Sequence, residues 1–344
     1  MTDLHSAVRR AVTDTAEPGS VELSEALRET LRDSAVQDGS VSFERLKSRV
    51  YRLRVGATSS RGRSFVLKRF DPWLARRNEL VARRWLPALG LGDRCPQLYV
   101  VAADRSGAWV WHVYEDLGDG AIDPAHPDRR SIAAVVELLA SLHTRGARHA
   151  LLPGCRHICG DLGAPYFAAN VRDAIAVLEP LAARPLRDRL LGRLYRLRDE
   201  QPLRARKLEA LGGPDTMLHG DLWTTNTFVA PPQNGGGARA RLIDWDHAAV
   251  GPATYDLSTF LYRFAPSDRP WILEAYRTTV AASGWTLPRA AELNGLFETA
   301  EYARYANRII WPAVALLEEG AAWGWDQLAE VERWFIAMTP VLPV

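Results

Sequence analysis

An ordered set of polar residues between positions 218 and 260 constrains this chain more than any other feature. Within LHGDLWTTNTF, Asp221 follows a glycine turn and Asn226 lies five positions later. Asp244 then closes a second short apolar run. Carboxylate and carboxamide oxygens are hard donors, and Mg²⁺ is held by one or two carboxylates while it keeps sites for phosphate and water. The pattern therefore predicts a site that holds Mg²⁺ against phosphate oxygens.

The spacing of this stretch fits a known catalytic-loop pattern. HGDLWTTN matches H-x-D-L-x-x-x-N, with Gly220 where protein kinases carry Arg. HGDLWTTN followed by IDWDHAAVGPATYDL resembles the aminoglycoside phosphotransferase and choline kinase family of small-molecule kinases, over roughly residues 40–310. A lone HGD turn or a solvated acidic loop arises easily by chance, but the whole ordered set does not. The resemblance implies a protein-kinase-like fold, ATP as donor and Mg²⁺ as cofactor.

The resemblance assigns roles position by position. Asp221 matches the base that orients the acceptor hydroxyl, and Asn226 and Asp244 match the magnesium ligands. Trp245 stands where protein kinases have the Phe of D-F-G. Asp256, in YDL, matches a carboxylate that braces the catalytic loop.

The predicted fold class is α+β, with two lobes like a protein kinase. Residues 1–38 are expected to form an N-terminal segment with one helix, the first twenty of them loosely ordered. Residues 39–115 form a nucleotide-binding lobe, with a small antiparallel β-sheet and one main helix. Residues 116–344 form a larger, mostly helical catalytic and substrate lobe, with helices near 290–310 and 312–336 at its end.

Composition excludes several classes of protein. The 344 residues are 47% hydrophobic and 24% charged, which suits a folded chain with a full core. The net charge of +2 gives no sign of a nucleic-acid partner. No run has the roughly 18 apolar residues of a membrane helix, and MTDLHSAVRRAV has no signal-peptide core. Three cysteines fit a reducing compartment, so a cytoplasmic location is expected. The oligomeric state stays open.

Lys68 is the central residue predicted for nucleotide binding. Only three of the 43 basic residues are lysines, and this one lies in the apolar strand SFVLKRF. Since an unpaired buried ammonium is costly, Lys68 is expected to bind the α- and β-phosphates, held by Glu79 from the next helix. A lysine whose ammonium extends to water from an edge strand is the alternative. Arg69 alternates to the other face and is expected to be solvated.

Two further segments are expected to contact the nucleotide. The turn Lys47-Ser48-Arg49 occupies the place of the glycine-rich loop of kinases but has no glycine, so Ser48 would supply a hydroxyl or N–H to a phosphate. VYEDLG resembles the hinge between the lobes in the family, where backbone groups bind the adenine edge. The corresponding residues are Glu115, Asp116 and Leu117.

Acceptor contacts are less well defined by the sequence. Glu298, Glu301, Tyr302 and Tyr305 share a helical face that suits a cationic acceptor, or forms an ordinary half-exposed helix. Asp246 and Asp161 are acceptor contacts, helix caps or loop acids. His143 is interpreted as a structural histidine. Cys155, His157 and Cys159 lack the second ligand pair of a zinc site.

These observations favour an ATP- and Mg²⁺-dependent kinase that phosphorylates a hydroxyl of an aminoglycoside-like antibiotic, an amino alcohol or a sugar. An antibiotic as acceptor would make the chain a resistance enzyme. A nucleotide-binding, pseudokinase-like module without turnover is the alternative, although every ligand position is filled. A protein kinase is disfavoured, because the glycine loop and an A-P-E segment are missing.

Overall fold

The computed structural model describes residues 4–31, 40–56, 62–230 and 237–343, in two compact units. The first unit comprises Met1–Ala121, Phe228–Pro232 and Ala240–Asp246, and the second comprises Ile122–Thr227, Gln233–Arg239 and His247–Val344. The three-part division drawn from the sequence stays a prediction. Of the loop expected at 230–240, residues 231–236 lie outside the described residues.

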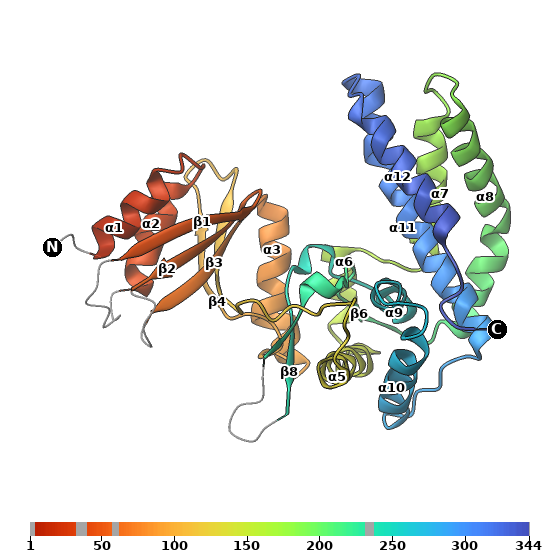
Figure 1. Cartoon of the computed structure of the whole chain (residues 1–344), viewed down its shortest axis with the longest axis horizontal. Coiled ribbons are helices and arrows are strands. Elements are labelled where there is room, and N and C mark those ends of the chain that lie inside the picture. The colour runs from red at the N-terminus through yellow and green to blue at the C-terminus, as the bar shows by residue number, and fades with distance from the viewer. Residues whose placement is uncertain (1–3, 32–39, 57–61, 231–236, 344) are drawn as a thin grey trace. The chain divides into compact units, whose positions relative to one another are not determined.

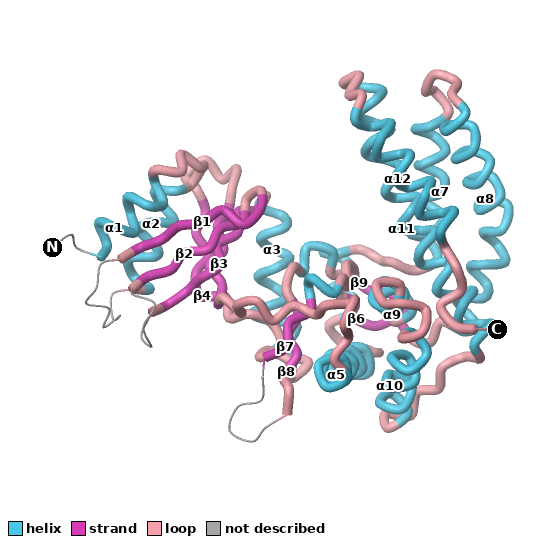
Figure 2. The backbone as a smooth tube through the Cα atoms, viewed as in Figure 1, coloured by secondary structure: helices cyan, strands magenta, loops and turns pink. Residues whose placement is uncertain are grey.

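A five-stranded antiparallel sheet forms the centre of the first unit, in the order β1-β2-β3-β5-β4 (Figures 1 and 2). Its strands are β1 (Val41–Lys47), β2 (Val50–Val55), β3 (Arg63–Phe70), β4 (Leu98–Ala103) and β5 (Val110–Glu115). Successive side chains of a strand point to opposite faces. Phe65 and Leu67 of β3 are therefore buried on one face, while Lys68 belongs to the other.

Two helices cover the face of the sheet that carries Phe65 and Leu67. They are α1 (Leu4–Thr13) and α2 (Ser20–Thr30), and their buried Val8, Val12, Leu23 and Leu27 share one apolar core with the strands. The expectation that residues 1–20 are loosely ordered is wrong for α1, because its apolar side chains complete this core. Arg69 is also not solvated: its guanidinium pairs with Glu17 at 2.6 Å and lies over the ring of Trp109.

The opposite face of the sheet meets α3 (Pro72–Leu80). A short π-helical segment, Val81–Trp85, and a last turn, Leu86–Ala88, prolong this helix. The ribbon β7 (Thr227–Ala230) and β8 (Arg239–Leu242) follows the catalytic-loop stretch, and the residues after β8 also belong to the first unit.

Helices dominate the second unit. They are α5 (Arg129–Gly146), α6 (Leu152–Cys159), α7 (Ala164–Leu178), α8 (Pro185–Leu211), α9 (Thr254–Leu261), α10 (Arg269–Ala281), α11 (Ala290–Glu318) and α12 (Trp323–Ala337). Helices α7, α8, α11 and α12 pack side by side around one apolar core (Figure 1). The antiparallel pair β6 (Asp215–Leu218) and β9 (Ala249–Pro252) frames the stretch that carries Asp221.

One helix boundary differs from the expectation. The break predicted before Pro312 is absent, and α11 continues through this proline to Glu318. Pro312 is buried in the unit, so packing offsets the hydrogen bond that a proline removes from a helix. The break falls instead between α11 and α12.

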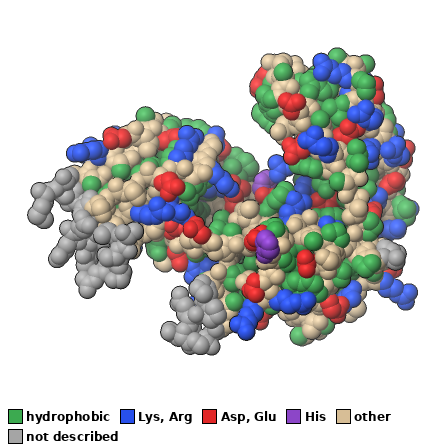
Figure 3. All heavy atoms as spheres, viewed as in Figure 1, with side chains coloured by type: hydrophobic (Ala, Val, Ile, Leu, Met, Phe, Trp, Pro, Cys, Tyr) green, Lys and Arg blue, Asp and Glu red, His purple; other side chains and the backbone are tan. Residues whose placement is uncertain are grey.

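The α+β, protein-kinase-like fold class is confirmed by this architecture. No helix among the described residues is long and apolar enough to span a bilayer. On the face shown in Figure 3, basic and acidic side chains are interspersed over both units. This mixing agrees with the small net charge of the chain.

Candidate functional site

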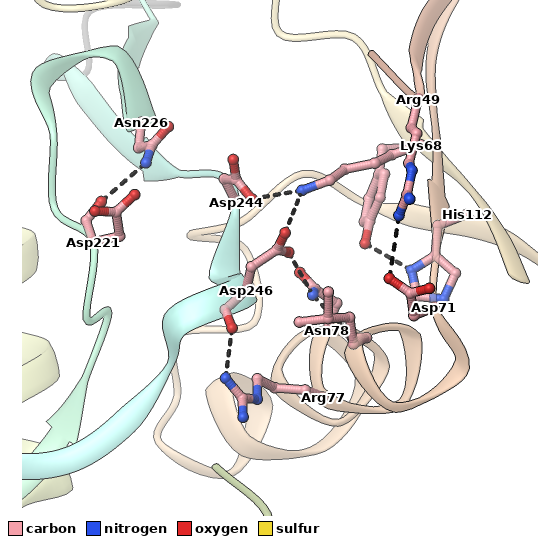
Figure 4. A network of polar contacts seen from close by, with 12 residues as sticks. Arg49, Lys68, Asp71, Arg77, Asn78, His112, Asp221, Asn226, Asp244 and Asp246 are labelled. Atoms are coloured by element: carbon pink, nitrogen blue, oxygen red, sulfur yellow. Dashed lines mark hydrogen bonds and ion pairs between the residues drawn. The ribbon is translucent and has the colours of Figure 1, made fainter. Parts of the chain in front are cut away.

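Lys68 is held by two carboxylates of the first unit. Its ammonium Nζ lies 2.6 Å from Oδ1 of Asp244 and 2.8 Å from Oδ2 of Asp246 (Figure 4). Burial alone would lower the pKa of Lys68, but the charges of both carboxylates raise it above its ordinary value. The ammonium therefore stays charged, and the strand sets it against an acidic pair from the segment after β8.

Asp246 is anchored from three sides within the same unit. Besides Lys68, its Oδ1 accepts a hydrogen bond from Nδ2 of Asn78 at 2.9 Å. Its backbone carbonyl accepts one from Nη1 of Arg77 at 2.5 Å. Burial raises the pKa of Asp246, against the lowering effect of Lys68. Both carboxylate oxygens have protein partners, so we do not retain Asp246 as an acceptor contact.

The predicted pairing of Lys68 with Glu79 is wrong. Among the described residues no ion pair joins them, and Glu79 pairs instead with Arg76 at 3.6 Å and with Arg83 at 3.0 Å. The physical reason is helical register, since consecutive residues of α3 point about 100° apart. Asn78 is buried and reaches Asp246, whereas Glu79 is half-buried and pairs with Arg83.

The catalytic-loop motif forms a compact turn in the second unit. Oδ1 of Asp221, which is half-buried, accepts a hydrogen bond from Nε1 of Trp223 at 2.7 Å. Nδ2 of Asn226 donates to the backbone carbonyl of Asp221 at 2.9 Å (Figure 4). The amide group of Asn226 is thereby fixed, and its Oδ1 is the atom left to bind a cation. The sequence interpretation assigned no role to Trp223.

Asp256 braces this loop, as the sequence predicted. Its carboxylate, on α9, accepts hydrogen bonds from the backbone N–H groups of His219 at 2.7 Å and Gly220 at 2.8 Å. Nε2 of His143 lies 3.4 Å away, and Nδ1 of this histidine is 2.8 Å from the hydroxyl of Tyr276. Burial raises the pKa of Asp256, but these contacts lower it below its ordinary value overall. The buried, charged carboxylate holds the turn before Asp221, and His143 has the structural role expected.

Gly220 is required by the geometry of the same turn. Its φ is +82°, in the left-handed region that favours glycine, and an added Cβ would lie 1.8 Å from the backbone oxygen of His247. Within the second unit, this contact sets the loop that carries Asp221 directly against the chain that follows Asp246.

The side chains of the predicted hinge hold its backbone in place. Oε2 of Glu115 accepts from Nη1 of Arg241 at 2.6 Å. Oδ2 of Asp116 accepts from Oγ of Ser64 at 2.6 Å and pairs with Nε of Arg52 at 2.8 Å. Among the described residues, the backbone groups of Leu117 have no hydrogen-bond partner. Unpaired backbone donors and acceptors of this kind are what an adenine edge requires.

Ser48 lies exposed at the tight turn between β1 and β2. The left-handed conformation of this turn falls on Arg49, whose φ is +63°. Nη1 of Arg49 pairs with Asp71 at 3.2 Å, and its guanidinium covers the ring of Trp109. These contacts stabilise the left-handed conformation of Arg49, which otherwise favours glycine.

Asp244 and Asn226 each carry an oxygen atom of the kind that binds a magnesium ion. Nowhere in the described ranges do three His, Cys, Asp or Glu side chains converge on one point, but Mg²⁺ needs only one or two carboxylates when phosphates and water complete its shell. Asp244 offers a carboxylate that is 41% exposed, and Asn226 offers its carboxamide oxygen. Asp244 belongs to the first unit and Asn226 to the second.

The acid and tyrosine face expected on α11 divides into two. Glu298 and Tyr302 face Arg204 of α8, which is 3.9 Å from the carboxylate and lies over the tyrosine ring. Glu301 and Tyr305 instead line a cavity. Asp161 accepts hydrogen bonds from the N–H of Gly163 and from Nε of Arg156, each at 2.7 Å, but no side chain caps α7, so Asp161 is a loop acid.

A family model described as "Phosphotransferase enzyme family" matches residues 43–293. A Plasmodium vivax ethanolamine kinase is similar in structure, with a TM-score of 0.60 and 11% identity over 91% of this chain and 88% of that one. The GDP and kanamycin complex of APH(2")-IIia has a TM-score of 0.59 and 15% identity over 90% and 98%. The choline kinase LicA from Streptococcus pneumoniae has a TM-score of 0.53 and 15% identity over 92% and 99%. At these identities the likeness concerns the fold alone. No curated protein matches the chain.

Proposed function

We propose that this chain, which belongs to the phosphotransferase enzyme family, transfers the γ-phosphoryl group of ATP, with Mg²⁺, to a hydroxyl of a small molecule. The observation that carries the proposal is the ion pair between Lys68 and Asp244, at 2.6 Å. A bound Mg·ATP requires a charged lysine for its phosphates and a carboxylate for its metal ion. Lys68 in the sheet and the partly exposed Asp244 after β8 are groups of these two kinds.

The nucleotide would be bound by groups of the first unit. The backbone of Asp116 and Leu117 would bind the adenine edge, and Ser48 would bind a phosphate. Lys68 would exchange part of its contact with Asp244 for phosphate oxygens. Glu79 is not proposed as its anchor, since Asp246 and Asn78 take that place. Asp244 and Asn226 would hold Mg²⁺, which when bound neutralises charge on the phosphates.

The acceptor would be activated by Asp221. Oδ1 of Asp221 already accepts a hydrogen bond from Nε1 of Trp223, so the second carboxylate oxygen of Asp221 would accept the hydrogen bond from the acceptor hydroxyl. The acceptor oxygen then forms a bond to the γ-phosphorus, while the bond between that phosphorus and the β,γ-bridging oxygen breaks. The hydroxyl proton passes to Asp221, and ADP leaves with the electron pair of the broken bond. Positioning by the Asp256 brace supplies the orientation that this step requires.

The test is phosphate transfer from Mg·ATP across a panel of hydroxylated amines, sugars and antibiotics. Asp221→Asn should lower turnover by roughly 10²–10⁴-fold and leave ATP binding, measured by thermal shift, near that of the wild type. Asp244→Asn should weaken the thermal shift by Mg·ATP itself. Asp199→Asn, at an exposed aspartate on α8, is the matched control. Wild-type turnover in Asp221→Asn would refute the mechanism, and ATP binding without transfer to any acceptor would favour the non-catalytic binding module.

A further inference from the structure

A cavity of about 390 Å³ opens in the second unit, between the end of α9, the helices α11 and α12, and Trp223. Its volume is in the range of small-molecule sites. Four aromatic side chains, Trp223, Tyr262, Tyr305 and Trp334, form much of its wall. The cavity therefore has the size and the apolar surface needed for one small ligand.

The charged residues that line this cavity are mostly basic. Arg263, Arg269, Arg304 and Arg308 face two carboxylates, Glu301 and Glu330. Two of these six residues pair with each other, because Nη1 of Arg304 contacts Oε1 of Glu301 on the same helix. The Glu301 carboxylate raises the pKa of Arg304 above its ordinary value, although burial alone would lower it. Positive charge remains in excess after this pair is removed.

Two of the remaining arginines each keep one buried donor atom without an acceptor, although Nε of Arg269 donates to the backbone carbonyl of Phe264 at 3.0 Å. Nε of Arg263 and Nη1 of Arg269 are buried, and neither has a hydrogen-bond partner among the described residues. Arg269 is only 7% exposed. Burial lowers the pKa of both guanidinium groups. Buried donors without acceptors are costly, and a bound anion would relieve that cost with charge-assisted hydrogen bonds.

The cavity shares a residue with the loop that carries Asp221. The guanidinium of Arg263 lies 4.0 Å from the centre of the Trp223 ring, and Nε1 of that ring donates to Asp221 at 2.7 Å. Oε2 of Glu301, which also lines the cavity, is buried and has no hydrogen-bond donor among the described residues, so it can accept a hydrogen bond from a hydroxyl. A ligand in this cavity is thus one side chain away from Asp221.

We infer that this cavity binds a carboxylate or phosphate group of the acceptor, so that the chain phosphorylates a small hydroxylated anion and not a polycation. The inference rests on the proposed function and names the chemical class of its acceptor. It reverses the expectation of a cationic acceptor, which rested on the acids and tyrosines of α11. Two of those residues, Glu298 and Tyr302, face Arg204 and not the cavity.

The inference is tested by calorimetry with four sugars of matched size on the full chain. Glucose 6-phosphate and gluconate are the anionic probes, glucose is neutral, and glucosamine is cationic. An anionic probe should bind at least about tenfold more tightly than glucosamine, as one charge-assisted contact allows. Comparison of the two anionic probes shows whether phosphate or carboxylate is preferred. Equal or tighter binding of glucosamine, or no binding of either anion, overturns the inference.

Variants test whether the anionic probes bind to the arginines of the cavity. Arg263→Gln and the exposed Arg308→Gln should each weaken anion binding about tenfold, and Arg263→Lys should restore part of it. Arg196→Gln, at an exposed position of α8, should leave binding unchanged. Unchanged binding in both glutamine variants overturns the inference. Phosphate transfer is measured separately. Anion binding that depends on Arg263, without transfer from Mg·ATP to any acceptor, would support the anionic ligand class and would contradict only the proposed kinase function.

Discussion

Nδ2 of Asn78 donates a hydrogen bond of 2.9 Å to Oδ1 of Asp246, a residue 168 positions later in the chain. This bond ties α3 to the segment after β8 and orients the carboxylate that holds Lys68. The lysine is therefore positioned through Asp246 and Asn78, and Glu79 has no part in it.

Asp246→Asn should destabilise the protein by roughly 1.5–3 kcal/mol, because it weakens the charge-assisted contact to Lys68 and leaves a buried ammonium with one carboxylate fewer. Glu79→Gln should change the free energy of unfolding by less than about 0.5 kcal/mol, since its partners Arg76 and Arg83 are exposed. Urea unfolding of both variants measures the difference. A larger loss in Glu79→Gln than in Asp246→Asn would contradict the assignment.

Asp256→Asn should lower kcat by roughly 10- to 100-fold, because one acceptor oxygen becomes an NH₂ group that opposes the N–H of His219 or Gly220, and the loop before Asp221 shifts. Since Asp256 does not contact the nucleotide in the proposed mechanism, KM for ATP should change little. Asp326→Asn, exposed on α12, is the control. A change in KM for ATP alone, with kcat intact, would refute a positioning role.

The sequence predicted those parts of the fold and site that depend on local pattern. Alternation in SFVLKRF placed Lys68 on one face of β3, and the spacing from His219 to Asn226 predicted that Asp221 and Asn226 lie in one loop, because both patterns involve only a few neighbouring residues. The catalytic role of this loop stays a prediction. It did not predict the partner of Lys68. Asn78 and Glu79 differ by one step on α3, and only the packing of that helix decides which side chain reaches Asp246.

At two other places, tertiary packing gave a structure different from the one that the local sequence pattern predicts. A helix break is expected before Pro312, yet α11 continues through this proline, which is buried in the unit. Charge on α11 suggested a binding face, and two cavity arginines, Arg304 and Arg308, lie four positions apart on that helix. The other two, Arg263 after α9 and Arg269 at the start of α10, could not be grouped with them by spacing. Trp223, inside the motif itself, could have been found, since a large aromatic residue two positions after Asp221 lies within reach of its carboxylate.

Gly220→Ala should destabilise the protein by roughly 2–5 kcal/mol, the sum of left-handed backbone strain and overlap with the backbone oxygen of His247. Gly284→Ala separates the two terms, because Gly284 has a similar φ of +79° but open space around its Cβ position. The control should lose only about 1–2 kcal/mol. Equal losses in the two variants, measured by thermal unfolding, would show that the contact with His247 does not matter.

His112 should make the free energy of unfolding depend on pH below neutrality. It is fully buried between Phe70 and Tyr114. Burial, reinforced by the positive charges of Arg83 and Lys68, lowers its pKa to about 3. The unfolded chain binds the proton near the ordinary pKa of about 6.5. Between these two pKa values the unfolded state binds more protons than the folded state. The stability that the neutral, buried His112 contributes is therefore fully present above a pH of about 6.5. It is lost as the pH falls toward about 3, by up to about 1.4 kcal/mol per pH unit.

His112→Gln removes the titrating ring and should flatten the slope of unfolding free energy against pH between about 6 and 4, relative to the wild type. His157→Gln, at an exposed histidine of α6, is the control. Chemical denaturation at several pH values measures all three proteins. Identical slopes in His112→Gln and the wild type would mean that His112 accepts a proton in the folded state as readily as in the unfolded chain.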